Sequence, residues 1–149
     1  MNKRGLNLIN RFIISKVSVW PKELESESKV ILSKDEGLIV TTPLSLKKKY
    51  AIVTIKLALK DYIYSNYNKY LVIIHYDNST LSRKLEYTIK FFRGKTLLAS
   101  VNLHERMRYS IIILNEVPDK INILIKAKNE VLSLNRIYTL KIKFILMLF

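Results

Sequence analysis

The stretch that decides the fold is residues 51–59, which read AIVTIKLAL. Every odd-numbered position in it is apolar, whereas Thr54 and Lys56 occupy even-numbered positions and Lys60 continues that set. Successive side chains of a β-strand point to opposite faces, so this period of two predicts one face against a core and the other against water. The pattern is typical of antiparallel sheets with one solvated face.

Three later segments repeat the alternation, with lysines opposite the apolar positions. The apolar sets are Leu85, Tyr87, Ile89 and Phe91, then Ile121, Ile123 and Ile125, then Tyr138, Leu140, Ile142 and Phe144. The lysines expected on the solvent faces are Lys56, Lys60, Lys90, Lys126, Lys141 and Lys143. Further strands are expected over 29–33, 38–41, 70–76 and 96–101, separated by turn residues such as Gly37, Gly94 and Pro118. The prediction is an all-β fold of eight or nine strands, a two-sheet antiparallel β-sandwich of jelly-roll type.

The first 28 residues leave two structures open. Leu6, Ile9, Ile13, Val17 and Trp20 are three or four residues apart, as on one face of a helix. Residues 11–20 also fit a strand or an extended arm, and Pro21 ends either element. The expected organisation is one domain, with an arm or first strand and a polar loop at 1–28 followed by the sandwich at 29–149.

The order of several short phrases carries a family resemblance. GLNLIN at 5–10, LIVTTPL at 38–44, YTIKFFRGK at 87–95, VPDKI at 117–121 and IYTLKI at 137–142 follow one another along the chain. This succession resembles the jelly-roll β-sandwich of carbohydrate-binding modules, and similar sandwiches form virion and cell-surface proteins. The resemblance implies the fold and implies carbohydrate binding as one function. Such modules are usually rich in glycine, whereas this chain has three.

Charge is the strongest compositional feature. The 149 residues include 26 basic and 12 acidic side chains, which gives a formal net charge of +14, and they include no cysteine. The excess charge would attract polyanions in a salt-dependent way, so an anionic surface or nonspecific nucleic acid is a candidate partner. The candidate polyanion contacts are basic clusters near turns: Lys47, Lys48, Lys49, Arg93, Lys95, Arg106 and Arg108.

Catalytic and metal-binding patterns are missing from the sequence. His75 and His104 stand in different segments, without the spacing of a zinc site. There is no nucleophile elbow and no phosphate-binding glycine loop, and the absence of cysteine excludes disulfides and thiolate ligands. We therefore expect no enzyme activity, no metal and no cofactor.

Two further features indicate binding surfaces. The first is a tyrosine-rich stretch whose rings can stack on sugars or bases: Tyr62, Tyr64, Tyr67 and Tyr70. The second is the apolar segment 144–149, FILMLF, which either lies under the N-terminal arm or is buried by another subunit. The candidate assembly interface comprises Leu6, Ile9, Phe12, Trp20, Ile145, Leu146, Met147, Leu148 and Phe149.

Together these observations favour a non-enzymatic structural protein, a β-sandwich subunit of a virion or another surface assembly that associates with itself or with other subunits. A carbohydrate- or ligand-binding module and a basic nucleic-acid-associated protein are the alternatives. No apolar run reaches the roughly 20 residues of a membrane-spanning helix, and residues 1–14 lack the pattern of a signal peptide. A cytoplasmic or virion location is expected.

Overall fold

Eleven β-strands and one short 3-10 helix account for most of what the computed structural model describes, namely residues 6–7, 11–33, 37–44, 50–60, 70–78, 85–104, 109–128 and 136–148. The strands are β1 Leu6–Asn7, β2 Phe12–Trp20, β3 Lys29–Ser33, β4 Gly37–Leu44, β5 Tyr50–Leu59, β6 Tyr70–Asn78, β7 Leu85–Arg93, β8 Thr96–His104, β9 Tyr109–Leu114, β10 Lys120–Lys128 and β11 Arg136–Leu148. The helix is η2, Lys22–Glu27. The all-β prediction is confirmed.

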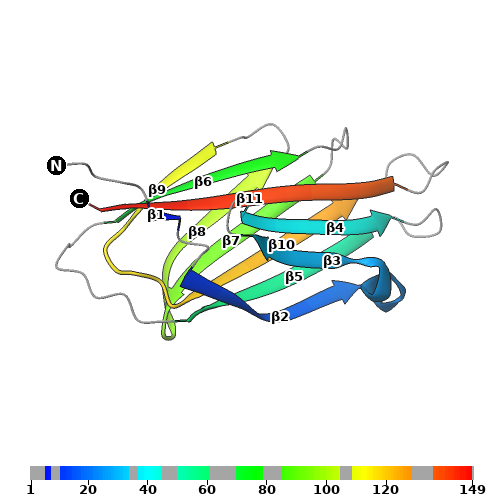
Figure 1. Ribbon diagram of the computed structural model, residues 1–149, viewed down its shortest axis with the longest axis horizontal. Helices are drawn as coiled ribbons and strands as arrows, with labels where there is room; N and C mark the ends of the chain where they lie inside the picture. The colour runs from blue at the N-terminus through cyan, green and yellow to red at the C-terminus, as the bar shows by residue number, and fades with distance from the viewer. Residues whose placement is uncertain are drawn as a thin grey trace.

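The strands form two antiparallel sheets (Figure 1). The six-stranded sheet has the order β3-β4-β11-β6-β9, with the two-residue β1 paired to β11 beside this path. The five-stranded sheet has the order β2-β5-β10-β7-β8. Neither sheet closes on itself, so β3 and β9 are the edges of the first and β2 and β8 the edges of the second.

The pairing of strands between β4 and β11 is nested. β4 pairs with β11, β5 with β10, β6 with β9 and β7 with β8. Successive pairs fall in alternate sheets, and β3 and β2 then extend the sheets beyond β4 and β5. The centre of this nested arrangement is the turn between β7 and β8. Gly94 in that turn has a φ of +60°, which a glycine adopts without steric cost.

The hydrophobic core lies on the inner face of the five-stranded sheet. The register places Ile123 between Ile55 and Ile89, and all three side chains are fully buried. Leu38 and Val40 of the other sheet belong to the same buried cluster. The inward positions predicted from the alternation are confirmed at Ala51, Val53, Ile55, Leu57, Tyr87, Ile89, Phe91, Ile121, Ile123 and Ile125. Removal of this apolar surface from water is the main force that holds the strands together.

Of the two structures left open for the N-terminal segment, helix or strand, the strand is the one observed. Residues 12–20 form β2 and pair with β5, so the helical spacing of the apolar residues does not produce a helix. The polar stretch after Pro21, expected as a loop, contains η2, whose Leu24 is buried in the core. The apolar residues of this segment have a helix-like spacing because β2 contains an irregularity between Ile14 and Lys16. This irregularity shifts the strand's alternation by one residue.

The strand count of eight or nine was too low. The additional strands are β1 and β9, and β9 contains the unbroken apolar run at 111–114. Such a run lacks the alternation that marks a half-solvated strand. In the structure β9 is an edge strand in which Leu114 is buried and Ile113 is 62% exposed. The predicted hairpins β3–β4 and β7–β8 are confirmed.

Candidate functional site

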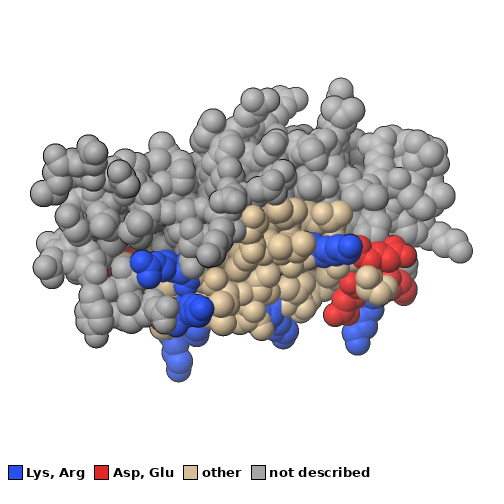
Figure 2. Space-filling view, in the orientation of Figure 1, with Lys and Arg blue, Asp and Glu red and all other residues tan. Residues whose placement is uncertain are grey.

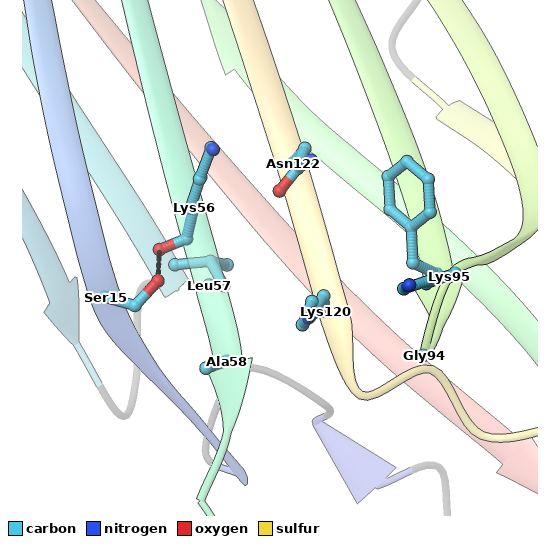
Figure 3. A pocket seen from close by; sticks show the side chains of 9 residues that line it. Ser15, Lys56, Leu57, Ala58, Gly94, Lys95, Lys120 and Asn122 are labelled. Atoms are coloured by element: carbon cyan, nitrogen blue, oxygen red, sulfur yellow. Dashed lines mark hydrogen bonds between the residues drawn. The ribbon is translucent and has the colours of Figure 1, made fainter.

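The outer face of the five-stranded sheet carries a depression of about 570 Å³ close to the β7–β8 turn. We call it the basic groove, and it is lined by Ser15, Lys56, Leu57, Ala58, Phe92, Gly94, Lys95, Lys120 and Asn122. Figure 3 shows that these residues come from neighbouring strands, with Lys120 and Asn122 two positions apart on β10 and Lys95 at the turn. The volume lies within the range of small-ligand sites.

A row of basic and polar side chains crosses this face at the level of the groove. Lys16, Lys56, Asn122 and Lys90 are consecutive cross-strand partners on β2, β5, β10 and β7. Since neighbouring strands lie about 4.8 Å apart, the row spans roughly 14 Å. The three lysines are exposed. The next row is uncharged there, with Thr88 donating a hydrogen bond to Asn102 at 3.0 Å.

A β-bulge in β2 brings an additional residue to this row. Ile14 pairs with Leu57 and Lys16 pairs with Lys56, so Ser15 has no partner of its own in the register. The bulge leaves two consecutive residues of β2, Ser15 and Lys16, opposite a single residue of β5. The Ser15 hydroxyl donates a hydrogen bond to the Lys56 carbonyl at 3.0 Å, a contact drawn in Figure 3.

Asp119 connects three backbone segments next to the groove. Its two carboxylate oxygens accept from the Gly94 N–H at 3.1 and 2.9 Å, and its own N–H donates to the Phe92 carbonyl at 2.9 Å. Its carbonyl accepts from the Leu59 N–H at 2.8 Å. One residue therefore ties the end of β5, the start of β10 and the β7–β8 turn together. These bonds position the backbone that presents Lys95.

Electrostatic repulsion is built into this face. Lys16 lies directly opposite Lys56, an arrangement of like charges that destabilises a sheet. The acidic side chain at the far end of the face, Glu86, has Lys126 as its cross-strand partner. Figure 2 shows basic side chains along the lower edge of the molecule and at the end that carries the β7–β8 turn, with acidic side chains gathered over η2 at the opposite end. The groove therefore lies in a region of positive potential.

The predicted polyanion contacts are placed only in part. Lys95 is exposed and lines the basic groove. Arg93 is half-buried and donates a hydrogen bond to the Val117 carbonyl at 3.4 Å. The remaining predicted contacts lie outside the described residues: Lys47, Lys48, Lys49, Arg106 and Arg108.

Sequence reasoning did not single out the other residues of the groove, nor the row of lysines that crosses it. Lys56 and Lys90 were expected on solvent faces, and they are exposed, as are Lys60 and Lys126. Alternation assigns a lysine to a face of its own strand, but the register between strands decides which lysines become neighbours. The sequence therefore predicted which face of its strand each lysine occupies, but not which lysines lie next to one another.

The predicted assembly residues separate into different environments. Phe12 is 4% exposed and belongs to the core of this chain, whereas Trp20 is 57% exposed on the edge strand β2. Leu6 pairs with Leu146 and Asn7 with Ile145, so the backbone of the apolar C-terminal segment has β1 as a neighbour.

On its other side the same segment pairs with β6, from Ile145 opposite Ile73 to Leu148 opposite Tyr70. β11 is thus an interior strand of its sheet, and the backbone of residues 145–146 is paired on both sides. Met147 pairs with Leu71 in the same sheet, while Ile9 and Phe149 lie outside the described residues.

The tyrosine-rich stretch falls almost wholly outside the described residues, which include none of Tyr62, Tyr64 and Tyr67. Tyr70 begins β6, opposite Leu114 of β9. His75 pairs with Lys143 and with Tyr109 in the six-stranded sheet, and His104 pairs with Glu86 in the five-stranded one. Within the described residues, no three histidine or acidic side chains gather as a metal site would need.

Comparisons with known proteins leave the groove to be interpreted from its own geometry, because no family model and no curated protein matches the chain. Among the described residues, no helix has the length and apolar character needed to cross a membrane.

Proposed function

We propose that the protein is a non-enzymatic structural subunit, a jelly-roll β-sandwich that associates side by side with copies of itself in a virion or another surface assembly. The nested pairing of β4–β11, β5–β10, β6–β9 and β7–β8, in alternate sheets, supports the jelly-roll assignment, since a jelly roll consists of eight antiparallel strands in two facing sheets. The buried cluster that both sheets share supports the sandwich.

One observation carries the assembly proposal: in the part of the chain whose side chains are described, the large apolar side chains that remain exposed all lie on edge strands. They are Ile13 and Trp20 on β2, Ile31 on β3, Leu97 on β8 and Ile113 on β9. Edge strands offer unpaired backbone groups, and natural proteins normally protect such edges with charge. Apolar side chains at all four edges favour association instead.

These residues form two different flanks. β2 and β3 lie together on one side of the molecule, and β8 and β9 lie together on the other (Figure 1). The first flank presents Ile13, Trp20 and Ile31, and the second presents Leu97 and Ile113. Two unlike surfaces on opposite sides pair head to tail, which produces rings or open arrays rather than a closed two-fold dimer.

A mixing experiment tests this arrangement. We expect the wild-type protein to form concentration-dependent oligomers in analytical ultracentrifugation. A first-flank variant, Ile13→Thr/Ile31→Thr, and a second-flank variant, Leu97→Thr/Ile113→Thr, should each be monomeric. An equimolar mixture should form a dimer and stop there, because each variant retains the flank that the other lacks. Threonine keeps the strand preference of isoleucine, so the variants should fold.

The matched control is Lys29→Thr/Ser100→Thr, which changes exposed polar residues on edge strands β3 and β8 and should leave the oligomers intact. A wild-type protein that stays monomeric at every concentration contradicts the proposal. Oligomers that survive in both apolar variants would contradict it equally, since the contacts would then lie elsewhere.

A further inference from the structure

We infer that the basic groove binds single-stranded nucleic acid, with the lysines on phosphates and the apolar floor against the bases. This goes beyond self-association, because the groove lies over β5, β10 and the β7–β8 turn, between Ile13 of β2 and Leu97 of β8 at the two ends of one cross-strand row. The lysines that line it are Lys56, Lys95 and Lys120, while Lys16 and Lys90 stand in the same cross-strand row as Lys56.

The arrangement of these charges fits an extended ligand. Lys16, Lys56 and Lys90 belong to one row across four strands, while Lys120 lies two positions from Asn122 of that row. A single compact anion would contact one or two of these side chains at a time. A chain of phosphates can neutralise all of them, and release of its counterions then supplies binding free energy.

The floor of the groove favours a single strand over a duplex. Ala58, Lys120 and Phe92 are consecutive cross-strand partners on β5, β10 and β7. Phe92 and Ala58 are both half-buried, and they give the groove an apolar lining beside the lysines. Unpaired bases offer flat faces that stack on aromatic side chains, whereas a duplex keeps those faces stacked on each other. A sulfated polysaccharide matches the lysines but offers no comparable flat aromatic face.

In the free protein the backbone beneath the groove is already held in place. The lysines stand on paired strands, Ser15 is bonded to the Lys56 carbonyl, and Asp119 fixes the turn that carries Lys95. Little ordering of the backbone is needed on binding, which lowers its entropic cost. A bound phosphate also neutralises the facing pair Lys16 and Lys56, so the repulsion present in the free protein is relieved.

Fluorescence anisotropy with a short oligodeoxythymidylate measures the binding. Five phosphate contacts predict a slope of log K against log salt of about −3.5, since each contact to a single strand contributes about −0.7. Affinity should therefore fall about 100-fold between roughly 50 and 200 mM salt. A duplex of the same length should bind more weakly at each salt concentration.

Matched variants separate the groove from net charge. Lys56→Ser/Lys120→Ser should make the slope shallower by about 1.4 and lower the affinity at low salt about tenfold or more. The control Lys22→Ser/Lys29→Ser removes two exposed lysines away from this face, one on η2 and one on β3, and should change the affinity less than about threefold. Equal losses in the two variants would overturn the inference, because diffuse charge would then explain the binding.

The stacking surface has its own test. Phe92→Leu keeps an apolar side chain but removes the ring, and it should lower oligodeoxythymidylate affinity about fivefold while leaving duplex affinity unchanged. An unfolding titration in urea confirms that this variant is folded. Tight binding of heparin combined with no binding of the oligonucleotide at low salt would overturn the inference in favour of a sulfated polysaccharide.

Discussion

Lys16 and Lys56 face each other across β2 and β5 with like charges. Directly opposed like charges cost a sheet a few tenths of a kcal/mol, up to about 1 kcal/mol. Ser18 and Thr54, the next cross-strand pair on this face, show that uncharged polar residues occupy an equivalent position. The lysine pair is therefore a local conflict between stability and surface charge, as expected where a site serves binding.

Replacing one lysine of the pair should move stability and binding in opposite directions. In Lys16→Glu the facing charges attract, so we expect the free energy of unfolding to rise by about 0.5–1 kcal/mol. The affinity for oligodeoxythymidylate should fall about tenfold at low salt, because one phosphate contact is lost and a repulsion is added. Urea unfolding and anisotropy measure the two effects.

Lys29→Glu is the control for that change, since Lys29 is exposed on β3 and lies opposite the uncharged Thr41. It alters net charge equally and should leave unfolding free energy and oligonucleotide affinity nearly unchanged. A loss of stability in Lys16→Glu would show that the facing lysines do not repel each other measurably.

At the scale of elements, the bulge in β2 decides which residues of that strand reach the core. Phe12 and Val19 are buried on opposite sides of Ser15, although Val19 comes seven positions after Phe12, which is an odd offset. An uninterrupted strand would place these two side chains on opposite faces. The additional residue at Ser15 restores both to the core and turns Lys16 outward.

Deletion of Ser15 should therefore be severe. Without the additional residue, one half of β2 must place its apolar side chains in water, and we expect a loss of about 3 kcal/mol or more in the free energy of unfolding. Ser15→Ala keeps the bulge and removes the hydrogen bond to the Lys56 carbonyl, so it should cost about 1 kcal/mol or less. Similar urea midpoints for the two variants would contradict this account of the bulge.

The bulge also explains where sequence reasoning succeeded and where it failed. Regular strands such as β5, β7 and β10 follow strict alternation, so their core residues, from Ala51 to Ile125, could be assigned from the sequence. A bulge breaks alternation without any signal in residue type, and in β2 the remaining spacing imitates a helix. The groove could not be predicted either, because it depends on the register that brings Lys16, Lys56 and Lys90 into one row.

At the scale of the whole molecule, exposed apolar side chains on the edge strands border the basic groove, with Ile13 opposite Ala58 and Leu97 opposite Phe92. The exposed apolar side chains stand on edge strands, and the row that contains Lys16, Lys56 and Lys90 crosses the outer face of the five-stranded sheet. Acidic side chains gather on η2 (Figure 2). Side-by-side association through the flanks would leave the outer face accessible. Copies in such an array would present their basic grooves in parallel, which raises the effective concentration of sites along one strand of nucleic acid.

The chain's single tryptophan reports directly on this association. Trp20 is 57% exposed on the first flank, so its emission should shift to shorter wavelength as the protein concentration rises and the flank becomes buried. The Leu97→Thr/Ile113→Thr variant should keep the emission of an exposed indole at all concentrations, because its partner flank is disabled. A concentration-dependent shift that persists in this variant would place the contact of Trp20 outside the head-to-tail interface.

The nested pairing has a consequence for synthesis on the ribosome. β11 lies between β4 and β6 in the six-stranded sheet but is synthesised after both of them. The two parts of this sheet therefore stay separate until β11 has emerged from the ribosome. The β7–β8 hairpin can form early, and each enclosing pair must wait for a partner farther along the chain, which makes folding slow. Until β11 is inserted, the facing sides of β4 and β6 offer unpaired backbone to any other strand. A nascent chain of this protein would therefore keep these strand edges unpaired until β11 has been synthesised.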